Sequence, residues 1–251
     1  MHDDSAVLPR LRGLICDMDG VLTDTAGLHA RAWKTLFDEV LAAAAGGGTF
    51  VPFDADADYR RYVDGKPREA GLRDFLAARG IDLPAGTPHD PAGASTLAAL
   101  AKRKNALFLR LLEGGIAPYP DALRLLDAAA ARGLRLAVIS ASRNAPRVLQ
   151  AAGLAARFAV RIDGNVAQER DLAGKPAPDV LLAAATALGI APADAAVIED
   201  AIAGVQAARA GGFGCIVGVD RDGTGGEALR AAGATRLVRS LDALLPPPAA
   251  G

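Results

Sequence analysis

Short apolar runs recur along the chain at intervals that a helix can fill. They are rich in Val, Ile and Leu and occupy residues 14–16, 134–139, 158–162, 196–198, 215–219 and 236–238. Between most of them lie Ala- and Leu-rich segments of helical period that close on glycine, the usual residue after a helix C-terminus. Runs that are apolar throughout are typical of strands buried on both faces of a parallel sheet. The alternation therefore predicts an α/β fold with a Rossmann-like, doubly wound parallel sheet as its core.

The interval between the first two apolar runs is far longer than one crossover helix requires. From about residue 28 to residue 114 the period is helical, with no comparable buried strand. Residues 45–58, which include three consecutive glycines, predict a flexible loop within this interval. We therefore expect an all-helical cap domain at 26–114, inserted into a catalytic core formed by 1–25 and 115–245. The tail at 246–251 is expected to be disordered.

Composition limits the classes of partner. The chain is 51% hydrophobic and 23% charged, and its 28 Lys and Arg residues are matched by 29 Asp and Glu residues. Because positive charge is not in excess, we expect neither nucleic acid nor a membrane surface as partner. The N-terminal segment lacks the pattern of a signal peptide, so we expect a cytoplasmic protein. Cys16 and Cys215 lie in apolar runs without CxxC spacing and predict two buried free thiols.

Carboxylates gather where the predicted strands end. Asp17 and Asp19 follow the first apolar run, and Glu199 and Asp200 follow the fourth. Ligands of an open parallel sheet bind outside the carboxyl ends of its strands, so we expect these groups to converge. Four converging carboxylates repel one another unless a cation lies among them. A hard divalent cation with oxygen ligands fits, and Mg²⁺ is the expected cofactor.

Two further groups suit the same edge of the sheet. Ser140 follows the second apolar run, and Lys175 lies in the connection after the third. A carboxylate, a hydroxyl, an ammonium and Mg²⁺ around one point can bind a phosphoryl group, whose transfer depends mostly on positioning and charge stabilisation. Asp17 can attack phosphorus to form an aspartyl phosphate. Asp19, two residues on along an extended chain, faces the same way and can donate and accept the proton.

The segments that carry these groups also resemble a known superfamily. In sequence and order they resemble the four motifs of the haloacid dehalogenase superfamily of phosphotransferases: DMDGVLTDT, VISAS, GKPAPD and VIEDAIAGV. The resemblance spans nearly the whole chain and implies that Ser140 and Lys175 bind the transferring phosphoryl group. Dehalogenases of the superfamily lack the second aspartate of DMD, so phosphoryl chemistry is favoured.

The same resemblance implies a different role for each of the carboxylates. Asp17 is the nucleophile and Asp19 the general acid–base. Asp17, Asp200 and the backbone carbonyl of Asp19 hold Mg²⁺, with Glu199 as a ligand or its close support. Asp24 is interpreted instead as the N-terminal cap of the following helix.

The inserted segment resembles the helical cap of the β-phosphoglucomutase-like branch of the superfamily, in the stretches DTAGLHARAWK, DGKPRE and AKRKN. The enzyme that gives this branch its name interconverts β-glucose 1-phosphate and glucose 6-phosphate through the 1,6-bisphosphate. The resemblance implies a hinge at Thr25 and a hydrogen bond from His29 near Asp19. It also implies sugar-phosphate contacts in the cap and after the second strand, from Gly65, Arg68, Lys104, Ala141, Ser142, Arg143 and Asn144.

A mutase also has a physical need for such contacts. Its intermediate carries two phosphates, one at the reacting centre and one remote, so a second cationic anchor is required. Arg68 suits a bidentate phosphate contact, and Lys104 adds a point charge.

Two other functions stay open at this stage. A sugar-phosphate phosphatase shares the first half-reaction and uses water as the acceptor, and a catalytically silent binding module shares only the fold. The candidate residues also have structural interpretations: Ser140 as a helix cap, His29 and Trp33 as core side chains, and Arg68 and Lys104 as a solvated helix face. The β-phosphoglucomutase reading is favoured, with a monomer acting on a small sugar phosphate as the expectation from the resemblance.

Overall fold

The computed structural model describes residues 11–63 and 68–245 of the 251-residue chain. The tail 246–251, predicted to be disordered, and Gly65, predicted to contact substrate, lie outside the described residues. The chain divides into two compact units, one formed by residues 1–24 and 116–251 and the other by residues 25–115. We call them the core unit and the helical unit.

The core unit contains one sheet of six parallel strands in the order β3-β2-β1-β4-β5-β6. Each predicted apolar run forms a strand: β1 (Gly13–Asp17), β2 (Arg135–Ile139), β3 (Val160–Ile162), β4 (Ala195–Glu199), β5 (Cys215–Val219) and β6 (Arg236–Val238). All residues of β1, β4 and β5 are buried, as expected for strands that are covered on both faces. The prediction of a Rossmann-like, doubly wound α/β core is confirmed.

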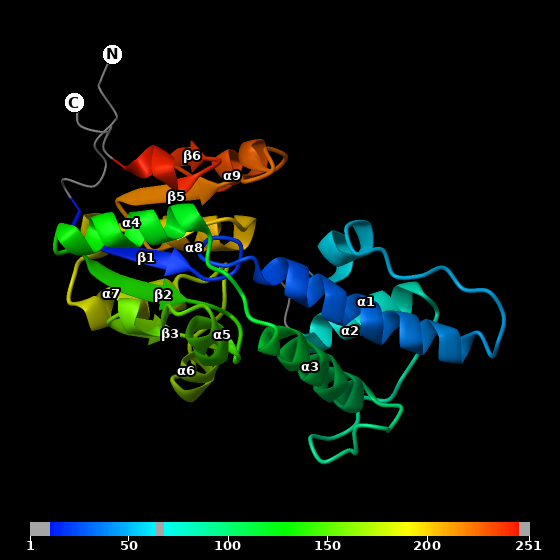
Figure 1. The fold of residues 1–251 in the computed structure, drawn as a ribbon. Coiled ribbons are helices and arrows are strands. Elements are labelled where there is room, and N and C mark those ends of the chain that lie inside the picture. Colours follow the sequence, from blue (N-terminus) through cyan, green and yellow to red (C-terminus); the bar gives the residue numbers. More distant parts are fainter. Residues whose placement is uncertain (1–10, 64–67, 246–251) are drawn as a thin grey trace. The chain divides into compact units, whose positions relative to one another are not determined.

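Helices cover both faces of this sheet (Figure 1). The helices of the core unit are α4 (Pro120–Ala131), α5 (Ala145–Ala151), α6 (Gly164–Glu169), α7 (Asp179–Leu188), α8 (Ile202–Ala210) and α9 (Gly226–Ala232). Alternate strand residues such as Ile15, Val197 and Ile216 pack in one apolar cluster with residues of α7, α8 and α9. Helix α4 packs against β2. The chain moves outward from β1 to β3 and then from β4 to β6 in the opposite direction, so right-handed crossovers place the two sets of helices on opposite faces.

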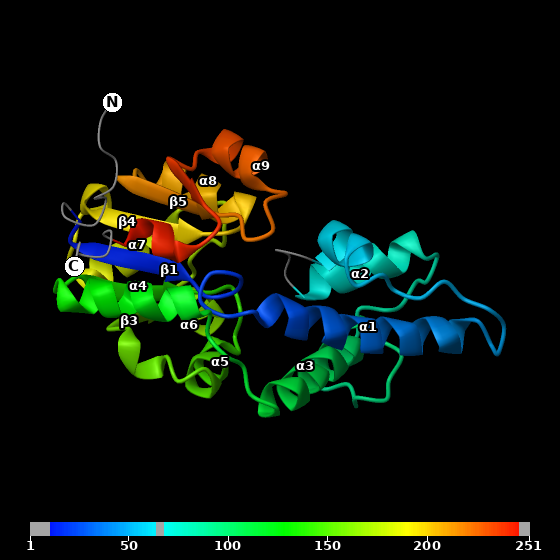
Figure 2. The same cartoon turned by 45° about the horizontal axis from the view of Figure 1, so that its top comes forward.

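The helical unit consists of α1 (Thr25–Ala44), a π-helical turn (Tyr59–Val63), α2 (Arg68–Ala78) and α3 (Leu97–Glu113) (Figure 2). Among its described residues there is no strand, as predicted. Its core joins aromatic side chains, with Phe37 4.1 Å from Phe75 and 5.0 Å from Phe53 between ring centroids. Phe53 lies in the segment predicted to be a flexible loop, which is irregular but brings this buried ring into the core.

Two smaller predictions can also be compared with the structure. Cys16 and Cys215 are buried and are not joined in a disulfide, as predicted. Trp33 is 4% exposed and stacks on Phe37, which confirms its place in the core. No helix among residues 11–63 and 68–245 has the length and apolar character needed to span a membrane.

Candidate active site

The candidate site lies between β1 and β4, where the order in which the chain adds strands to the sheet reverses. Cys16 of β1 pairs with Ile198 of β4, so the next residues, Asp17 and Glu199, end their strands side by side. On its other side β1 pairs with β2, and Asp17 is level with Ile139, the residue before Ser140. In doubly wound sheets this switch point is where ligands bind, because the connections leave in opposite directions and open a crevice there.

The two aspartates of the DMD stretch are held by different partners. Asp17 Oδ2 accepts a hydrogen bond of 2.9 Å from the backbone N–H of Asp19. Asp19 Oδ2 accepts one of 3.2 Å from the hydroxyl of Ser140, whose oxygen in turn accepts from the Ser142 N–H at 3.1 Å. The helix cap suggested for Ser140 is wrong, because α5 has Asn144 at its N-cap position and Ser140 faces Asp19. The backbone bond and the serine hold the two carboxylates in separate, defined positions.

Lys175 joins the ends of β1 and β4. Its Nζ donates to Asp17 Oδ1 at 2.5 Å and to the two carboxylate oxygens of Glu199 at 3.0 and 3.1 Å. Burial alone lowers the pKa of a lysine, but the negative charges of Asp17 and Glu199 outweigh it and raise the pKa of Lys175. The ammonium therefore stays charged beside the candidate nucleophile. A charged donor there can also bind an oxygen of a phosphoryl group.

Three carboxylates at this edge have the arrangement of a metal site. Asp17, Glu199 and Asp200 each offer an oxygen, and these atoms lie within 4.8 Å of one another. Burial, followed by the negative charge of Asp17, raises the pKa of Glu199. The same causes raise the pKa of Asp200 to about 8, although Asp200 remains the exposed member of the set. A donor set of oxygens alone whose negative charges repel one another fits a hard divalent cation such as Mg²⁺.

Two glycines that the sequence prediction missed leave room for these carboxylates. A Cβ on Gly20 would lie 1.8 Å from Asp200 Oδ2, and one on Gly204 would lie 1.9 Å from Glu199 Oε1. Gly20 also has a φ of +79°, which favours glycine. A signal was present, because both glycines belong to the motif segments DMDG and VIEDAIAGV. Their reason is spatial, since each allows a carboxylate to approach the backbone.

The loop after β2 contains the other predicted phosphate contacts of the core unit. The N–H of Asn144 donates to Ser142 Oγ at 3.1 Å, and Asn165 Nδ2 donates to the carbonyl of Arg143 at 3.0 Å. Ala141 and Arg143 are exposed. The loop is thus held through backbone and short side chains, which leaves the Arg143 side chain at the surface.

In the helical unit the structure brings His29 and Lys104 together. His29 Nδ1 lies 2.6 Å from Lys104 Nζ, and the imidazole stacks on Phe108 with 4.2 Å between ring centroids. Lys104 is only 3% exposed, and its ammonium lies 4.8 Å from the centre of the Trp33 ring. Burial, then the charges of Lys104 and Arg68, lower the pKa of His29 well below its ordinary value. The prediction of a solvated helix face is therefore wrong for Lys104, which is held among aromatic rings.

The remaining predicted residues of this unit have separate surroundings. Arg68 begins α2, and its Nη2 donates to Asn105 Oδ1 on α3 at 3.0 Å. Thr25 is the first residue of α1 and is buried. Asp24, predicted as a helix cap, directly precedes it.

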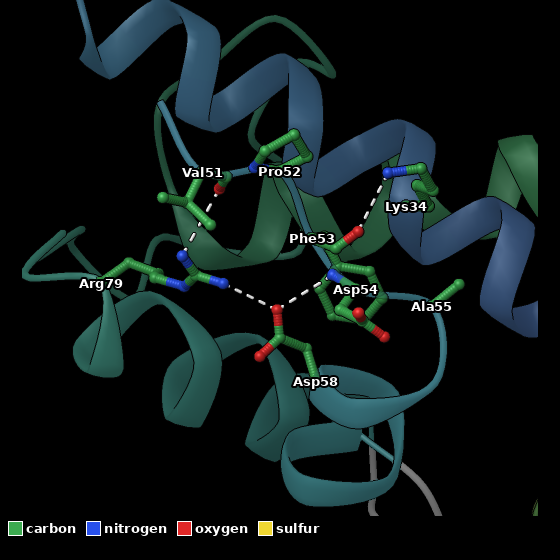
Figure 3. A pocket seen from close by; sticks show the side chains of 8 residues that line it. All are labelled: Lys34, Val51, Pro52, Phe53, Asp54, Ala55, Asp58 and Arg79. Carbon is green, nitrogen blue, oxygen red and sulfur yellow. Dashed lines mark hydrogen bonds and ion pairs between the residues drawn. The ribbon is translucent and has the colours of Figure 1, made fainter. Parts of the chain in front are cut away.

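The helical unit also contains a pocket that sequence reasoning did not anticipate (Figure 3). Its volume is about 570 Å³, and it is lined by Lys34, Val51, Pro52, Phe53, Asp54, Ala55, Asp58 and Arg79. Both cations are neutralised locally: Lys34 pairs with Asp38 at 2.9 Å and Arg79 with Asp58 at 2.7 Å. The pocket therefore lacks the excess positive charge that a phosphate group requires.

Comparison with known proteins agrees with the geometry of the core unit. Residues 11–212 match the model of a family described as haloacid dehalogenase-like hydrolase. The chain belongs to this family. It is 47% identical over 241 residues to a β-phosphoglucomutase of Mycobacterium bovis, an alignment that covers 94% of this chain and 92% of the relative.

Solved structures of two members of the haloacid dehalogenase-like family are also similar to this chain. A β-phosphoglucomutase from Clostridium difficile superposes with a TM-score of 0.72 at 25% identity, over 94% of this chain and 93% of that one. CbbY from Rhodobacter sphaeroides, solved in complex with xylulose-1,5-bisphosphate, superposes with a TM-score of 0.68 at 26% identity, over 92% and 95% of the two chains. The chain is thus an enzyme of the phosphoglucomutase and phosphatase type, in the β-phosphoglucomutase-like branch.

Proposed function

We propose that this enzyme is a Mg²⁺-dependent β-phosphoglucomutase that acts through an aspartyl phosphate on Asp17. The observation that carries the proposal is the pair of aspartates, Asp17 against Lys175 and Asp19 against Ser140. It is supported by the mutase of 47% identity, which matches almost the whole chain.

In the first half-reaction, a carboxylate oxygen of Asp17 attacks a phosphorus of the sugar bisphosphate. The bond from phosphorus to the sugar oxygen breaks, and the leaving oxygen takes a proton from Asp19. In the second, Asp19 removes a proton from the free 6-hydroxyl of β-glucose 1-phosphate, whose oxygen attacks the phosphorus of the aspartyl phosphate; the bond from phosphorus to Asp17 breaks, which regenerates the bisphosphate and frees Asp17. Lys175 and Ser140 stabilise the charge on the transferring group.

The metal is assigned to the carboxylate set of the core unit. Asp17, Asp200 and the Asp19 carbonyl would hold Mg²⁺, with Glu199 in direct contact or in support. When bound, the ion supplies positive charge that offsets the phosphoryl oxygens and orients them. The remote phosphate is assigned to Arg68 of the helical unit, whose guanidinium suits a phosphate, and the buried Lys104 of the same unit adds positive charge.

A ³¹P NMR time course tests the proposal. The enzyme is mixed with Mg²⁺, β-glucose 1-phosphate and a trace of glucose 1,6-bisphosphate, and α-glucose 1-phosphate serves as the stereochemical control. We expect glucose 6-phosphate from the β-anomer without inorganic phosphate. Asp17→Asn is expected to abolish turnover, whereas Asp127→Asn, at an exposed aspartate of α4 paired with Arg157, is the matched control that retains it.

A phosphatase is the second candidate, because CbbY was solved with a sugar bisphosphate and the family is described as hydrolases. Water then accepts the phosphoryl group in the second half-reaction. Rapid release of inorganic phosphate in the same time course would overturn the mutase and support the phosphatase. Turnover by Asp17→Asn equal to that of the wild type would instead exclude both and favour a protein whose Asp17 has no chemical role.

A further inference from the structure

Arg221 makes an unusual set of contacts directly after β5. Its Nε donates to the carbonyl of Gly20 at 2.9 Å, and its Nη2 donates to the carbonyl of Val21 at 2.9 Å. The other side of the guanidinium meets Asp121, with Nη1 3.0 Å from Oδ2 and Nη2 3.3 Å from Oδ1. Its carbon lies 3.7 Å from the centre of the Tyr119 ring. A planar guanidinium can make all these contacts at once, and an ammonium cannot.

The carbonyls that Arg221 binds belong to the loop that follows the candidate nucleophile. This loop closes on itself, because the N–H groups of Leu22 and Thr23 both donate to the Met18 carbonyl, at 3.0 and 3.1 Å. Asp19 lies inside it. Gly20 lies against the carboxylate of Asp200, and the backbone there has no room for a Cβ. The position of this loop therefore sets the positions of both carboxylates relative to Asp17.

The partners of Arg221 also include Tyr119 and Asp121, which lie at the start of α4, where the chain re-enters the core unit. Asp121 is buried and accepts from the Leu241 N–H at 2.8 Å and from the Ser240 hydroxyl at 3.0 Å. The N–H of Tyr119 donates to the Leu22 carbonyl at 2.9 Å. Arg221 is thus the link between β5, the loop after β1 and the segment that begins α4.

We propose that Arg221 is a positioning residue that holds the loop of residues 18–23, and with it Asp19 and Asp200, in the geometry that phosphoryl transfer requires. The inference rests on the proposed function for its chemistry. Its contacts lie wholly within the core unit. Arg221 follows β5 and binds the loop after β1, and β4 lies between these two strands in the sheet, so its hydrogen bonds join two strand ends that are not neighbours.

The test compares Arg221→Gln and Arg221→Lys with the same changes at Arg124, which donates to Asp242 at 2.7 Å through two nitrogens on the surface of the same unit. Activity is measured with Mg²⁺ on β-glucose 1-phosphate and, separately, on p-nitrophenyl phosphate, which needs the aspartate chemistry but not glucose specificity. Hydrogen exchange of the peptide covering residues 18–23 reports the loop. We expect both Arg221 variants to lose at least about tenfold in kcat with KM changed less than about threefold, because small misplacements of reacting groups cost this much. The loop amides should exchange faster, and the Arg124 variants should match the wild type.

The outcomes separate this inference from the proposed function. If kcat of the Arg221 variants stays within threefold of the Arg124 variants on either substrate, the inference is overturned. If Arg221→Gln does not fold, Arg221→Lys decides by the same criterion. If the wild type converts neither substrate, the proposed function fails, and unchanged exchange of residues 18–23 in Arg221→Lys would overturn the positioning role on its own.

Discussion

Replacing Gly204 by alanine tests whether the carboxylate of Glu199 is confined as the structure shows. Gly204 is the third residue of α8, and alanine is more favourable than glycine in a helix by up to about 1 kcal/mol. From helix propensity alone, the variant would be more stable than the wild type. The structure predicts the opposite sign.

The magnitude follows from the space around Gly204. A Cβ there would lie 1.9 Å from Glu199 Oε1 and 2.1 Å from its Cδ, so the carboxylate has to move by more than about 1 Å. Glu199 is 1% exposed and its oxygens lie 3.0 and 3.1 Å from Lys175 Nζ, so this movement weakens a buried ion pair. Overpacking costs about 1–3 kcal/mol, and complete loss of a buried pair about 3–5 kcal/mol. After the gain in helix propensity, we expect Gly204→Ala to be less stable by about 1–4 kcal/mol.

Urea unfolding followed by circular dichroism measures this change, with hydrogen exchange of β4 and α8 as a local readout. The only tryptophan of the chain, Trp33, lies in the helical unit, so its fluorescence reports that unit separately. Glu199→Ala provides the matched background, because the added methyl group then meets no carboxylate. There the same substitution should stabilise the protein by about 0.5–1 kcal/mol. Stabilisation of similar size in both backgrounds would refute the reasoning.

Three further predictions concern titratable groups. The pKa of Asp200 is raised to about 8, so without a cation the stability that its bound proton contributes is lost as the pH rises towards that value. Asp200→Asn should flatten this loss of stability when it is measured in EDTA. Mg²⁺ should raise the Tm of the wild type more than that of the variant. The pKa of His29 is lowered, so the unfolded chain protonates this histidine at a higher pH than the folded chain does, and stability should fall below about pH 6.5. Lys104→Met should move the His29 titration, followed by NMR, to higher pH. An unchanged titration would contradict the contact between His29 and Lys104. Burial and the charge of Asp17 raise the pKa of the Cys16 thiol to about 12, and Cys215 is also buried. A thiol reagent should therefore modify neither cysteine in the native protein and both after unfolding. Rapid labelling of the native protein would argue against their burial.

The strands of the core could be predicted from sequence because each is buried on both faces. Such strands appear as short apolar runs without alternation, and the polar residue after each run marks its carboxyl end. That is why the sequence alone predicts Asp17, Ser140 and Glu199 at one edge of the sheet. Their order along the chain predicted the alternation of strands and helices.

The supporting contacts of the site could not be predicted in this way. Arg221 follows β5 in a glycine-rich segment that reads as an ordinary polar loop, and Asp121 reads as an acidic residue in the first turn of a helix. They meet because the sheet order places β5 two strands from β1, which the local pattern does not specify. In the sequence, Gly204 is simply a poor helix former. The need for glycine at this position is visible only in the structure, where the Glu199 carboxylate occupies the space of a Cβ.

The charge count at the edge of the sheet constrains the order of chemical events. Asp17, Asp19, Glu199 and Asp200 carry four formal negative charges, and Lys175 contributes one positive charge in contact with them. A phosphate dianion would be repelled by the remainder. A divalent cation removes two of the three net negative charges, and a proton on Asp19 removes the third. In the proposed mechanism, the proton that Asp19 donates to the leaving sugar oxygen is therefore also the proton that lets the substrate phosphate approach. Asp19→Asn, which cannot exchange this proton, should therefore lose turnover of the sugar phosphate, and turnover equal to that of the wild type would contradict this assignment of Asp19.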